Sequence, residues 1–368
     1  MNALDVYDGL TERRTRFLRV DELCRLAVQA GHLPDPAADA GRPLKEKKHL
    51  ELAQGAFLAE ILGDPDCGTH LCHSMLLPRK ESLELQKSFE KSGNAEFPGA
   101  SLRREGKAAV LTMSNPDFLN AEDETTLAGV ETAVDVALLD PATEVCVLRG
   151  GAVTHPKHAG RRLFGAGINL THLYQGKIRY LWYLIRDLGF VNKFYRGLAK
   201  EVVSPEVDSI EKLWIAAVDG FAIGGHCQIL LTMDYTIAAK DAYLTLPARK
   251  EGIVPGAADL RLPRFVGDRI ARQAVMAERR IACDSAEGRM ICDEVDSPEK
   301  IDAAILRTVE KLTGSGVVSA ASNRRAFRAG QEPLDMFRRY MAVYAREQAH
   351  CHFSPALIAN LEKNWKVK

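Results

Sequence analysis

The segment AAVDGFAIGGHCQILLTMDYTIAA, residues 216–239, constrains the fold more than any other part of the chain. Its first residues form an apolar run typical of a buried strand, which ends at Asp219 and Gly220. Gly224 and Gly225 then open an apolar helix, and YTIAA returns to a strand-like pattern. The N–H groups that begin a helix have no partner within it. The segment therefore predicts an α/β core with free backbone donors beside a glycine turn.

Short β-branched runs alternate with helices through the middle of the chain. From Ala108 the sequence predicts strands at AAVLTMS, EVCVLRGG and LWIAAVDG, with a helix over AEDETTLAGVETAVDVALL after the first. From Leu10 to about Leu71, and again after Arg264, apolar residues recur at helical spacing. We therefore expect an N-terminal helical subdomain over residues 1–98, a core over residues 99–270 and a C-terminal helical region over residues 271–368.

The charge balance argues against several classes of partner. With 49 basic and 49 acidic residues the net charge is zero, which offers no attraction to nucleic acid or an anionic membrane. No apolar run reaches the roughly 18 to 20 residues needed to span a bilayer, and residues 1–20 are too charged for a signal peptide. We expect a cytoplasmic protein that binds neither nucleic acid nor membrane.

The eight cysteines are scattered, which favours reduced thiols that pack in the core over a disulfide framework. Cys67, His70, Cys72 and His73 could be zinc ligands, as could the cluster at residues 350–352. Neither group has a paired CxxC spacing, so we expect no metal site.

A second glycine-containing segment, GRRLFGAGINL at residues 160–170, can bend tightly beside a ligand because residues 165–167 are small. Together with the N–H groups of the helix that Gly225 opens, such a loop can form an oxyanion hole. Two converging amides stabilise an oxygen that gains negative charge, such as a thioester carbonyl that becomes an enolate.

Three motifs in this order resemble those of the crotonase superfamily. FGAGINL resembles the FxAGxDL loop, GGHCQ with TMDYTIAA resembles GGGxELxxxCDxxxA, and YLTLPARKEGIVPGAADLRLPRFVG resembles the stretch around PE. The resemblance implies a spiral of ββα turns that binds acyl-CoA, with helices added at both ends, in a homo-oligomer (trimer or hexamer). It assigns the oxyanion amides to Ile168 and Gly225, where a side chain on Gly225 would block the thioester.

Two departures from the family pattern bear directly on catalysis. Hydratases of this family use the Glu of GGGxE and the Glu of PE to handle water and protons, and this chain has Gln228 and Ala248 there. Gln cannot exchange a proton as a carboxylate does, and Ala has no polar side-chain atom. A standard enoyl-CoA hydratase is therefore disfavoured.

A narrower resemblance agrees with these departures. From FLNAEDETTLAGVETAVDVALLDP to QAHCHFSPALIANL the chain resembles the 3,5-dihydroxyphenylacetyl-CoA 1,2-dioxygenase family of glycopeptide-antibiotic biosynthesis. That resemblance implies that O2 oxidises the acyl-CoA to 3,5-dihydroxyphenylglyoxylate and free CoA, with no metal, flavin or other cofactor. The glyoxylate then supplies dihydroxyphenylglycine synthesis.

The same resemblance places polar residues at the substrate. We expect Gln228 to hydrogen-bond the substrate, and Glu122 and Arg186 to lie in its pocket. Glu122 could instead be an acidic residue favoured at a helix N-terminus. Arg186 could form a solvated ion pair with Asp187, or it could be buried and meet the phenolic hydroxyls.

Other predicted contacts concern the α-carbon and the CoA arm. Leu170, Ile253 and Val254 are expected to form apolar walls near the α-carbon, or else to be core residues. The basic segment THPKHAGRR could face the CoA phosphates or could be a solvated loop. The residues expected at CoA are His155, Pro156, Lys157, His158, Ala166, Gly167 and Arg249.

Two other functions stay open. One is an oxygen-independent acyl-CoA enzyme, a thioester hydrolase or isomerase, with Glu122 or Glu251 as its base. The other is a catalytically silent acyl-CoA-binding subunit that kept the glycine loops. The sequence does not identify the group that removes the α-proton in the dioxygenase reaction.

Overall fold

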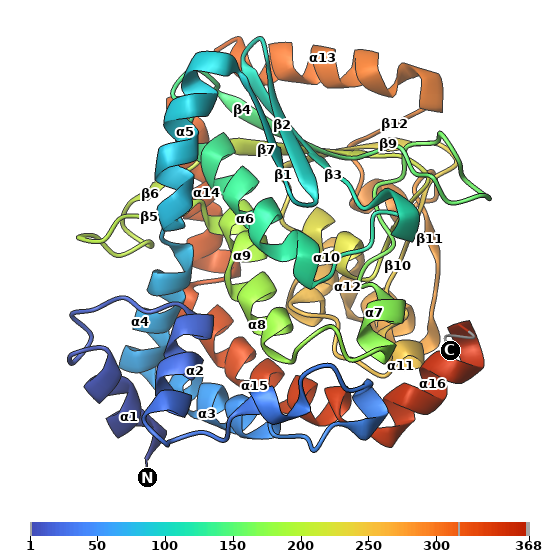
Figure 1. Cartoon of the computed structure of the whole chain (residues 1–368). Coiled ribbons are helices and arrows are strands. Elements are labelled where there is room, and N and C mark those ends of the chain that lie inside the picture. Colours follow the sequence, from blue (N-terminus) through green and yellow to red (C-terminus); the bar gives the residue numbers. More distant parts are fainter. Residues whose placement is uncertain (1, 316, 366–368) are drawn as a thin grey trace.

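A central sheet is enclosed by helices from both ends of the chain in the computed structural model, which describes residues 2–315 and 317–365 (Figure 1). The sheet has seven strands. In spatial order they are β1 (Asn94–Phe97), β2 (Ala100–Glu105), β3 (Ala108–Met113), β4 (Val145–Gly150), β7 (Leu213–Val218), β9 (Tyr235–Ala239) and β12 (Glu294–Asp296).

The pairing and burial of these strands agree with their apolar sequences. β1, β2 and β3 pair antiparallel, whereas β3, β4, β7, β9 and β12 are parallel. Almost every residue of β3, β4 and β7 is buried, as expected for parallel strands covered on both faces. The predicted strands at AAVLTMS, EVCVLRGG, LWIAAVDG and YTIAA are confirmed.

Helices connect the parallel strands and carry the site. α6 (Glu124–Leu139) joins β3 to β4, and its N-cap residue Asp123 forms a reciprocal capping box with Thr126. α10 (Gly225–Leu230) lies between β7 and β9, as the glycine pair predicted. A smaller sheet of β8 (Phe221–Ile223), β10 (Tyr243–Thr245) and β11 (Ile281–Ala282) lies beside α10.

The remaining elements are mostly helical. Between β4 and β7 lie α7 (Leu170–Tyr174), α8 (Leu181–Leu188), α9 (Phe190–Arg196), β5 (Leu198–Ala199) and β6 (Ser209–Ile210). After β10 come α11 (Ala248–Glu251), α12 (Ala258–Ala277), α13 (Ile301–Thr313), α14 (Val318–Gln331), α15 (Leu334–His352) and α16 (Pro355–Trp365). The short 3-10 turns are Pro36–Asp39, Leu44–Glu46, Pro116–Phe118, Gly288–Met290 and Pro298–Lys300.

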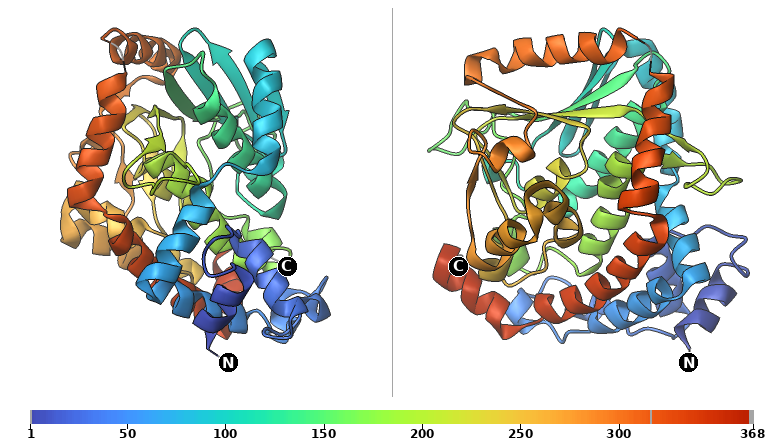
Figure 2. Two further views of the ribbon diagram at one scale, coloured as in Figure 1. Left: turned by 90° about the vertical axis from the view of Figure 1, so that its left-hand side faces the viewer. Right: turned by 180° about the vertical axis from the view of Figure 1, so that it is seen from behind.

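The two ends of the chain pack on each other below the sheet. The N-terminal helices are α1 (Ala3–Leu10), α2 (Val20–Gln29), α3 (Leu52–Gly63), α4 (Pro65–Leu76) and α5 (Lys80–Ser92). α15 lies along α3, and seen from behind α13 to α16 run around the outside of the molecule (Figure 2). Arg338 of α15 donates to the carbonyls of Leu62 and Gly63 at 2.6 and 2.8 Å, which caps the end of α3.

The division of the chain at residues 98 and 270 stays a prediction.

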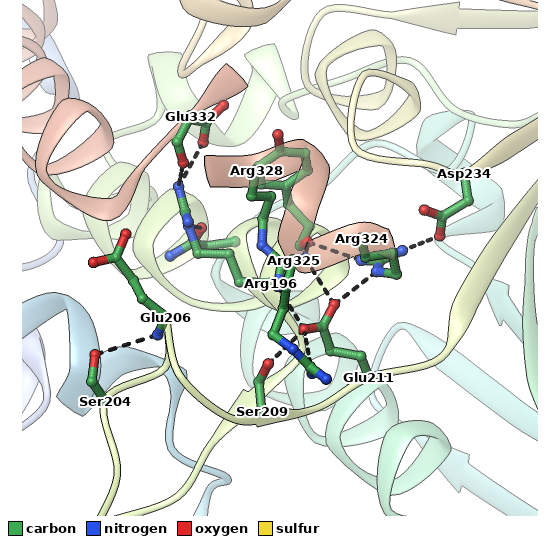
Figure 3. Close-up of polar contacts among 12 residues, drawn as sticks. Arg196, Ser204, Glu206, Ser209, Glu211, Asp234, Arg324, Arg325, Arg328 and Glu332 are labelled. Carbon is green, nitrogen blue, oxygen red and sulfur yellow. Dashed lines mark hydrogen bonds and ion pairs between the residues drawn. The ribbon is translucent and has the colours of Figure 1, made fainter. Parts of the chain in front are cut away.

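Buried ion pairs attach α14 to the body of the protein. Figure 3 shows Glu211, whose side chain is fully buried, among arginines of α14. Arg324 and Arg328 donate to its carboxylate at 2.9 and 2.8 Å, and Arg324 also pairs with Asp234. The acidic groups of this cluster are thus matched by arginines, which favours a structural role.

We predict that Gly55→Ala destabilises the protein although alanine favours helices. A Cβ at Gly55 would lie 2.5 Å from the Cβ of Ala349, so α3 and α15 would have to separate. We expect a loss of about 1–3 kcal/mol in the free energy of unfolding, measured by urea denaturation. The matched control is Gly63→Ala in the same helix, where a Cβ meets open space; it should leave the stability unchanged or raise it by up to about 1 kcal/mol. Equal effects of the two changes would contradict this account.

Candidate active site

The two glycine loops singled out in the sequence lie against each other. The first loop runs beside β8: the Gly165 N–H donates to the Phe221 carbonyl at 3.1 Å, and the Ile223 N–H donates to the Gly165 carbonyl at 3.0 Å. A Cβ at Gly167 would lie 3.1 Å from the nitrogen of Gly225, so glycine permits this close approach. The first loop therefore reaches the start of α10.

Two backbone donors at this contact are unpaired. Glu122 and Ile168 form an isolated parallel β-bridge. The Glu122 N–H donates to the Gly167 carbonyl at 2.7 Å, and the Glu122 carbonyl accepts from the Asn169 N–H at 2.8 Å. This pattern uses the groups on either side of Ile168 and leaves its own N–H free. Gly225 is the first residue of α10, so its N–H lacks an intrahelical acceptor. Neither N–H donates to any acceptor in the described part of the chain, which supports the predicted oxyanion hole.

Arg186 of α8 is the centre of a buried polar network. Its Nε and Nη2 donate to the two carboxylate oxygens of Glu122 at 2.6 and 2.9 Å. Its Nη1 donates to Asp187 at 2.7 Å and to Oε1 of Gln228 at 2.9 Å. Nη2 also donates to the Gly225 carbonyl at 2.8 Å. A guanidinium has five N–H donors, so the protein uses all of them.

This network corrects two interpretations from the sequence. Arg186 and Glu122 are both buried, so Arg186 is not in a solvated ion pair, and the helix N-cap is Asp123, not Glu122. Because its donors are occupied, Arg186 has none left for the phenolic hydroxyls. It instead positions its partners. The Oε1 of Gln228 accepts from Arg186, so the amide NH2 of Gln228 remains to donate into the cavity that this residue lines.

Glycine at position 225 serves this network. A Cβ there would lie 2.7 Å from Oε1 of Glu122 and 2.9 Å from Nη2 of Arg186. A side chain at this position would therefore displace the Glu122–Arg186 pair, and the expectation that it would also block the thioester stays a prediction.

His226 holds the first loop, and sequence reasoning missed it. The Gly167 N–H donates to Nδ1 of this fully buried ring at 3.0 Å. Burial lowers the pKa of His226 to about 4, so the ring is neutral at pH 7 and carries its proton on Nε2. A Cβ at Gly165 would lie 2.2 Å from Nε2. The sequence shows a histidine after Gly225 but not the loop that its ring reaches.

An inner and an outer cavity meet at Ile168. The outer cavity has a volume of about 590 Å³, within the usual range for ligand sites, whereas the inner one has about 20 Å³, room for about one water. Ile168 and Glu251 are the two described residues that line both. The inner cavity is also lined by Trp182, Tyr183, Arg186, Asp187, Gly224, Gly225, Gln228, Leu246, Ala248, Ile253, Val254, Pro255 and Tyr344.

The three residues predicted to form apolar walls do not all line the same cavity. Ile253 and Val254 line the inner cavity, as expected for residues near an α-carbon. Leu170 lines the outer cavity, so the structure does not bring it together with the other two. The aromatic residues Trp182, Tyr183 and Tyr344 were missed because they lie on α8 and α15, outside the three motifs.

Two of the seven residues predicted at CoA line the outer cavity. His155 and Ala166 line it, Pro156 and Lys157 are exposed on the neighbouring loop, and the ring of His158 contacts Phe221 edge-on. Gly167 contacts the start of α10.

Arg249 does not line this cavity, and its guanidinium donates to the Met276 carbonyl and to Glu278. The cations that line the cavity are Lys250 and Arg280, which sequence reasoning did not select.

Glu251 lies at the end of α11 and is 4% exposed. Its carboxylate has no hydrogen-bond partner within residues 2–315 and 317–365. Burial raises the pKa of Glu251 to about 7, partly opposed by Lys250. A carboxyl group with this pKa can both accept and release a proton near neutral pH.

Other predicted features lie outside the site. All eight cysteines are free thiols, His70 Nδ1 is 2.7 Å from the Tyr7 hydroxyl, and His73 Nε2 is 2.8 Å from the Lys200 carbonyl. No group of three His, Cys, Asp or Glu suited to a metal ion occurs where the chain is described. Within the same ranges every helix is too short or too polar to cross a bilayer.

Known proteins resemble this chain in sequence and fold. The family model for enoyl-CoA hydratase/isomerase matches residues 103–353, more than half of the chain. A (3,5-dihydroxyphenyl)acetyl-CoA 1,2-dioxygenase of Amycolatopsis orientalis is 47% identical over 354 residues, covering 95% of this chain and 81% of the relative. A crotonyl-CoA hydratase of Syntrophomonas wolfei subsp. wolfei is 28% identical over 232 residues, covering 63% and 82%.

A solved structure of an enoyl-CoA hydratase from Mycobacterium avium subsp. paratuberculosis has a TM-score of 0.60 at 19% identity, covering 74% of this chain and 97% of that one. This similarity confirms the predicted fold class, a ββα spiral core with helices added at both ends.

We predict that Arg186→Met lowers the free energy of unfolding by about 3–5 kcal/mol, because it leaves the carboxylates of Glu122 and Asp187 buried without their cation. Chemical denaturation measures this change. The control is Arg179→Met, which removes a half-exposed arginine from its pair with Glu124 and should cost at most about 1 kcal/mol. A loss below that of the control would show that the network is not needed for stability.

We predict that Glu251 makes the stability of the protein fall as pH rises. Its folded pKa, about 7, lies above its ordinary value of 4.5, so the stability present below pH 4.5 is lost between pH 4.5 and 7. Glu251→Gln removes this loss, and its stability relative to wild type should increase by about 3 kcal/mol from pH 4.5 to pH 8. Denaturation at both pH values tests this, with exposed Glu84→Gln as control. A constant difference would refute the prediction.

Proposed function

Because this chain belongs to the enoyl-CoA hydratase/isomerase family, the crotonase superfamily, we propose that it is a (3,5-dihydroxyphenyl)acetyl-CoA 1,2-dioxygenase. It converts this thioester and O2 to 3,5-dihydroxyphenylglyoxylate and CoA, for dihydroxyphenylglycine and antibiotic biosynthesis. The relative with that activity is 47% identical along 95% of the chain.

The side chains that line the inner cavity, beside the proposed oxyanion donors, are the main support for this proposal. At the two hydratase carboxylate positions, the amide of Gln228 and the methyl group of Ala248 line it. An amide cannot activate water as a base, and a methyl group cannot transfer a proton. The site therefore retains the means to form an enolate without the paired acids that hydration requires.

The backbone donors perform the first step. The N–H groups of Ile168 and Gly225 bind the thioester oxygen and stabilise the negative charge that develops there when an α-proton leaves. The carbanion is flanked by the thioester and by an electron-rich ring, over which its charge is delocalised. Such a carbanion reduces O2 directly and forms a peroxide at the α-carbon.

The peroxide then completes the reaction within the same site. Its outer oxygen attacks the thioester carbonyl and expels the CoA thiolate. Loss of the second α-hydrogen breaks the O–O bond and gives the ketone and the carboxylate. Both atoms of O2 enter the product, the thiolate takes up one proton and a second proton is released, so atoms and electrons balance without a redox cofactor.

The apolar inner cavity suits this chemistry. Trp182, Ile253 and Val254 exclude water from the carbanion and give O2, itself apolar, a place beside the α-carbon. The cavity volume of about 20 Å³ does not accommodate an aryl ring, so side chains around it must move when substrate binds. The amide of Gln228 then faces the ring or the intermediate.

The CoA arm occupies the outer cavity in this proposal. Lys250 and Arg280 supply positive charge along its wall, and His155 lies at the loop that precedes the oxyanion segment. Phosphate groups favour such cations. The exposed loop with Pro156, Lys157 and His158 lies beyond this wall.

Assembly and location are part of the proposal. Crotonase-type folds usually form trimers or dimers of trimers, and we propose a homo-oligomer of this kind in the cytoplasm. Sedimentation of the purified protein measures its assembly. The three-region division of the chain likewise remains a proposal.

A thioester hydrolase is the second candidate, because Glu251 borders both cavities and could activate water. A catalytically silent acyl-CoA-binding subunit is the remaining alternative.

We predict stoichiometric O2 uptake and CoA thiol release when metal-stripped protein is given (3,5-dihydroxyphenyl)acetyl-CoA in air, because the carbanion reduces O2 without a cofactor. An oxygen electrode and a thiol reagent measure the two quantities. With 18O2, mass spectrometry should find both labelled atoms in the glyoxylate. Thiol release at the same rate under nitrogen would instead establish a hydrolase, and binding without turnover would establish a silent subunit.

A further inference from the structure

The junction between the two cavities marks where the substrate reacts. The thioester oxygen must lie at the N–H of Ile168, and Ile168 borders both the inner cavity and the outer one. The aryl group then points inward and the CoA sulfur outward, so the α-carbon and the scissile C–S bond lie at this boundary. Glu251 is the other described residue that borders both cavities.

The other carboxylates near the inner cavity are already engaged. Both oxygens of Glu122 accept from Arg186, and Asp187 accepts from Arg186 at 2.7 Å. Arg186 thus occupies both oxygens of Glu122 and one oxygen of Asp187, so the guanidinium holds these carboxylates in place, although burial raises the pKa of Asp187. Glu251 differs because no described group donates a hydrogen bond to its carboxylate, although it is buried.

Keeping a buried carboxyl group without a partner is costly to folding, so its presence at a reaction centre points to a use. Resting on the proposed function, we propose that Glu251 is the catalytic base that removes both α-hydrogens in turn. This position is not one of the two hydratase carboxylates, which correspond to Gln228 and Ala248. The chain thus retains one base at a new place beside the same oxyanion hole.

The overall reaction requires such a group to act twice. In the first step Glu251 takes an α-proton, and the carbanion forms its C–O bond to O2. The peroxide attacks the thioester carbonyl, the C–S bond breaks, and protonated Glu251 gives its proton to the departing CoA thiolate. The regenerated carboxylate takes the second α-hydrogen, the C–H electrons form the ketone, and the O–O bond breaks to leave the carboxylate. Glu251 then releases this proton to solvent.

The place of Glu251 explains how one residue can reach both partners. Glu251 lines both cavities, and in this proposal the α-carbon lies on the inner side of that boundary and the sulfur on the outer side. Burial raises the pKa of Glu251 to about 7, which makes it a stronger base than an exposed glutamate and also a usable acid at neutral pH.

The test separates proton removal from oxygenation. (3,5-Dihydroxyphenyl)acetyl-CoA is incubated with protein in D2O under nitrogen, and deuterium at the α-carbon is followed by mass spectrometry; O2 uptake in air is measured in parallel. Glu251→Gln should reduce exchange and O2 uptake about 100-fold or more, and Glu251→Asp should restore part of both. Equilibrium dialysis under nitrogen should show that Glu251→Gln still binds the thioester. The control is Glu347→Gln, an exposed position on α15, which should behave as wild type.

Each outcome decides the inference. Exchange or O2 uptake by Glu251→Gln near the wild-type rate would overturn it. Exchange by wild type that is lost in Glu251→Gln, but without O2 uptake by either, would support the base and refute the dioxygenase. O2 uptake by wild type without exchange means that the proton stays shielded from solvent, and the loss of uptake in Glu251→Gln then supports the base. Wild type with neither exchange nor uptake would overturn both proposals.

Discussion

A single buried guanidinium, that of Arg186, joins the segments that form the site. It reaches the carboxylate of Glu122 before α6, the side chain of Gln228 in α10 and the carbonyl of Gly225. Removing a cation from water is costly, and only a complete set of acceptors offsets that cost. Because all five donors are matched, the network specifies one arrangement of the loops. The free N–H groups of Ile168 and Gly225 are held in place by the bonds made around them.

The helices at the two ends of the chain complete this site. α15 supplies Tyr344 to the inner cavity, and Oε1 of its Gln348 accepts from the Val254 N–H at 2.8 Å. The same helix packs on α3, where Gly55 allows the close approach. The N-terminal helices therefore support the wall of the cavity from outside without contributing a catalytic group.

The chemistry proposed for the site follows from the loss of the two glutamates that hydratases of this family use. A hydratase must hold water between two carboxylates, whereas a carbanion that reacts with O2 must be protected from water. Gln228 and Ala248 replace the acids with an amide and a methyl group, and aromatic and aliphatic side chains enclose the rest. One carboxyl group at the cavity boundary, that of Glu251, is compatible with this environment because proton transfer requires no bulk water.

Local patterns sufficed to predict much of the fold. The strands at residues 108–113, 145–150, 213–218 and 235–239 follow from short apolar, β-branched runs, and the helix at residues 124–139 follows from the longer segment between the first two. The glycines of the two loops predicted the pair of free amides, because a tight turn and a helix start are properties of neighbouring residues.

What the tertiary structure alone decided is which side chains meet. Arg186 could have been solvated, and only packing from α6 and α10 shows it buried with five acceptors. His226 stands within a motif, and Tyr344 and Arg280 lie outside all three, but the groups that each of them meets are distant in the chain. Glu251 was one candidate base among others until the fold placed it between two cavities. Residue type determines what chemistry a side chain can perform, but burial and the absence of a partner arise from segments that only folding brings together.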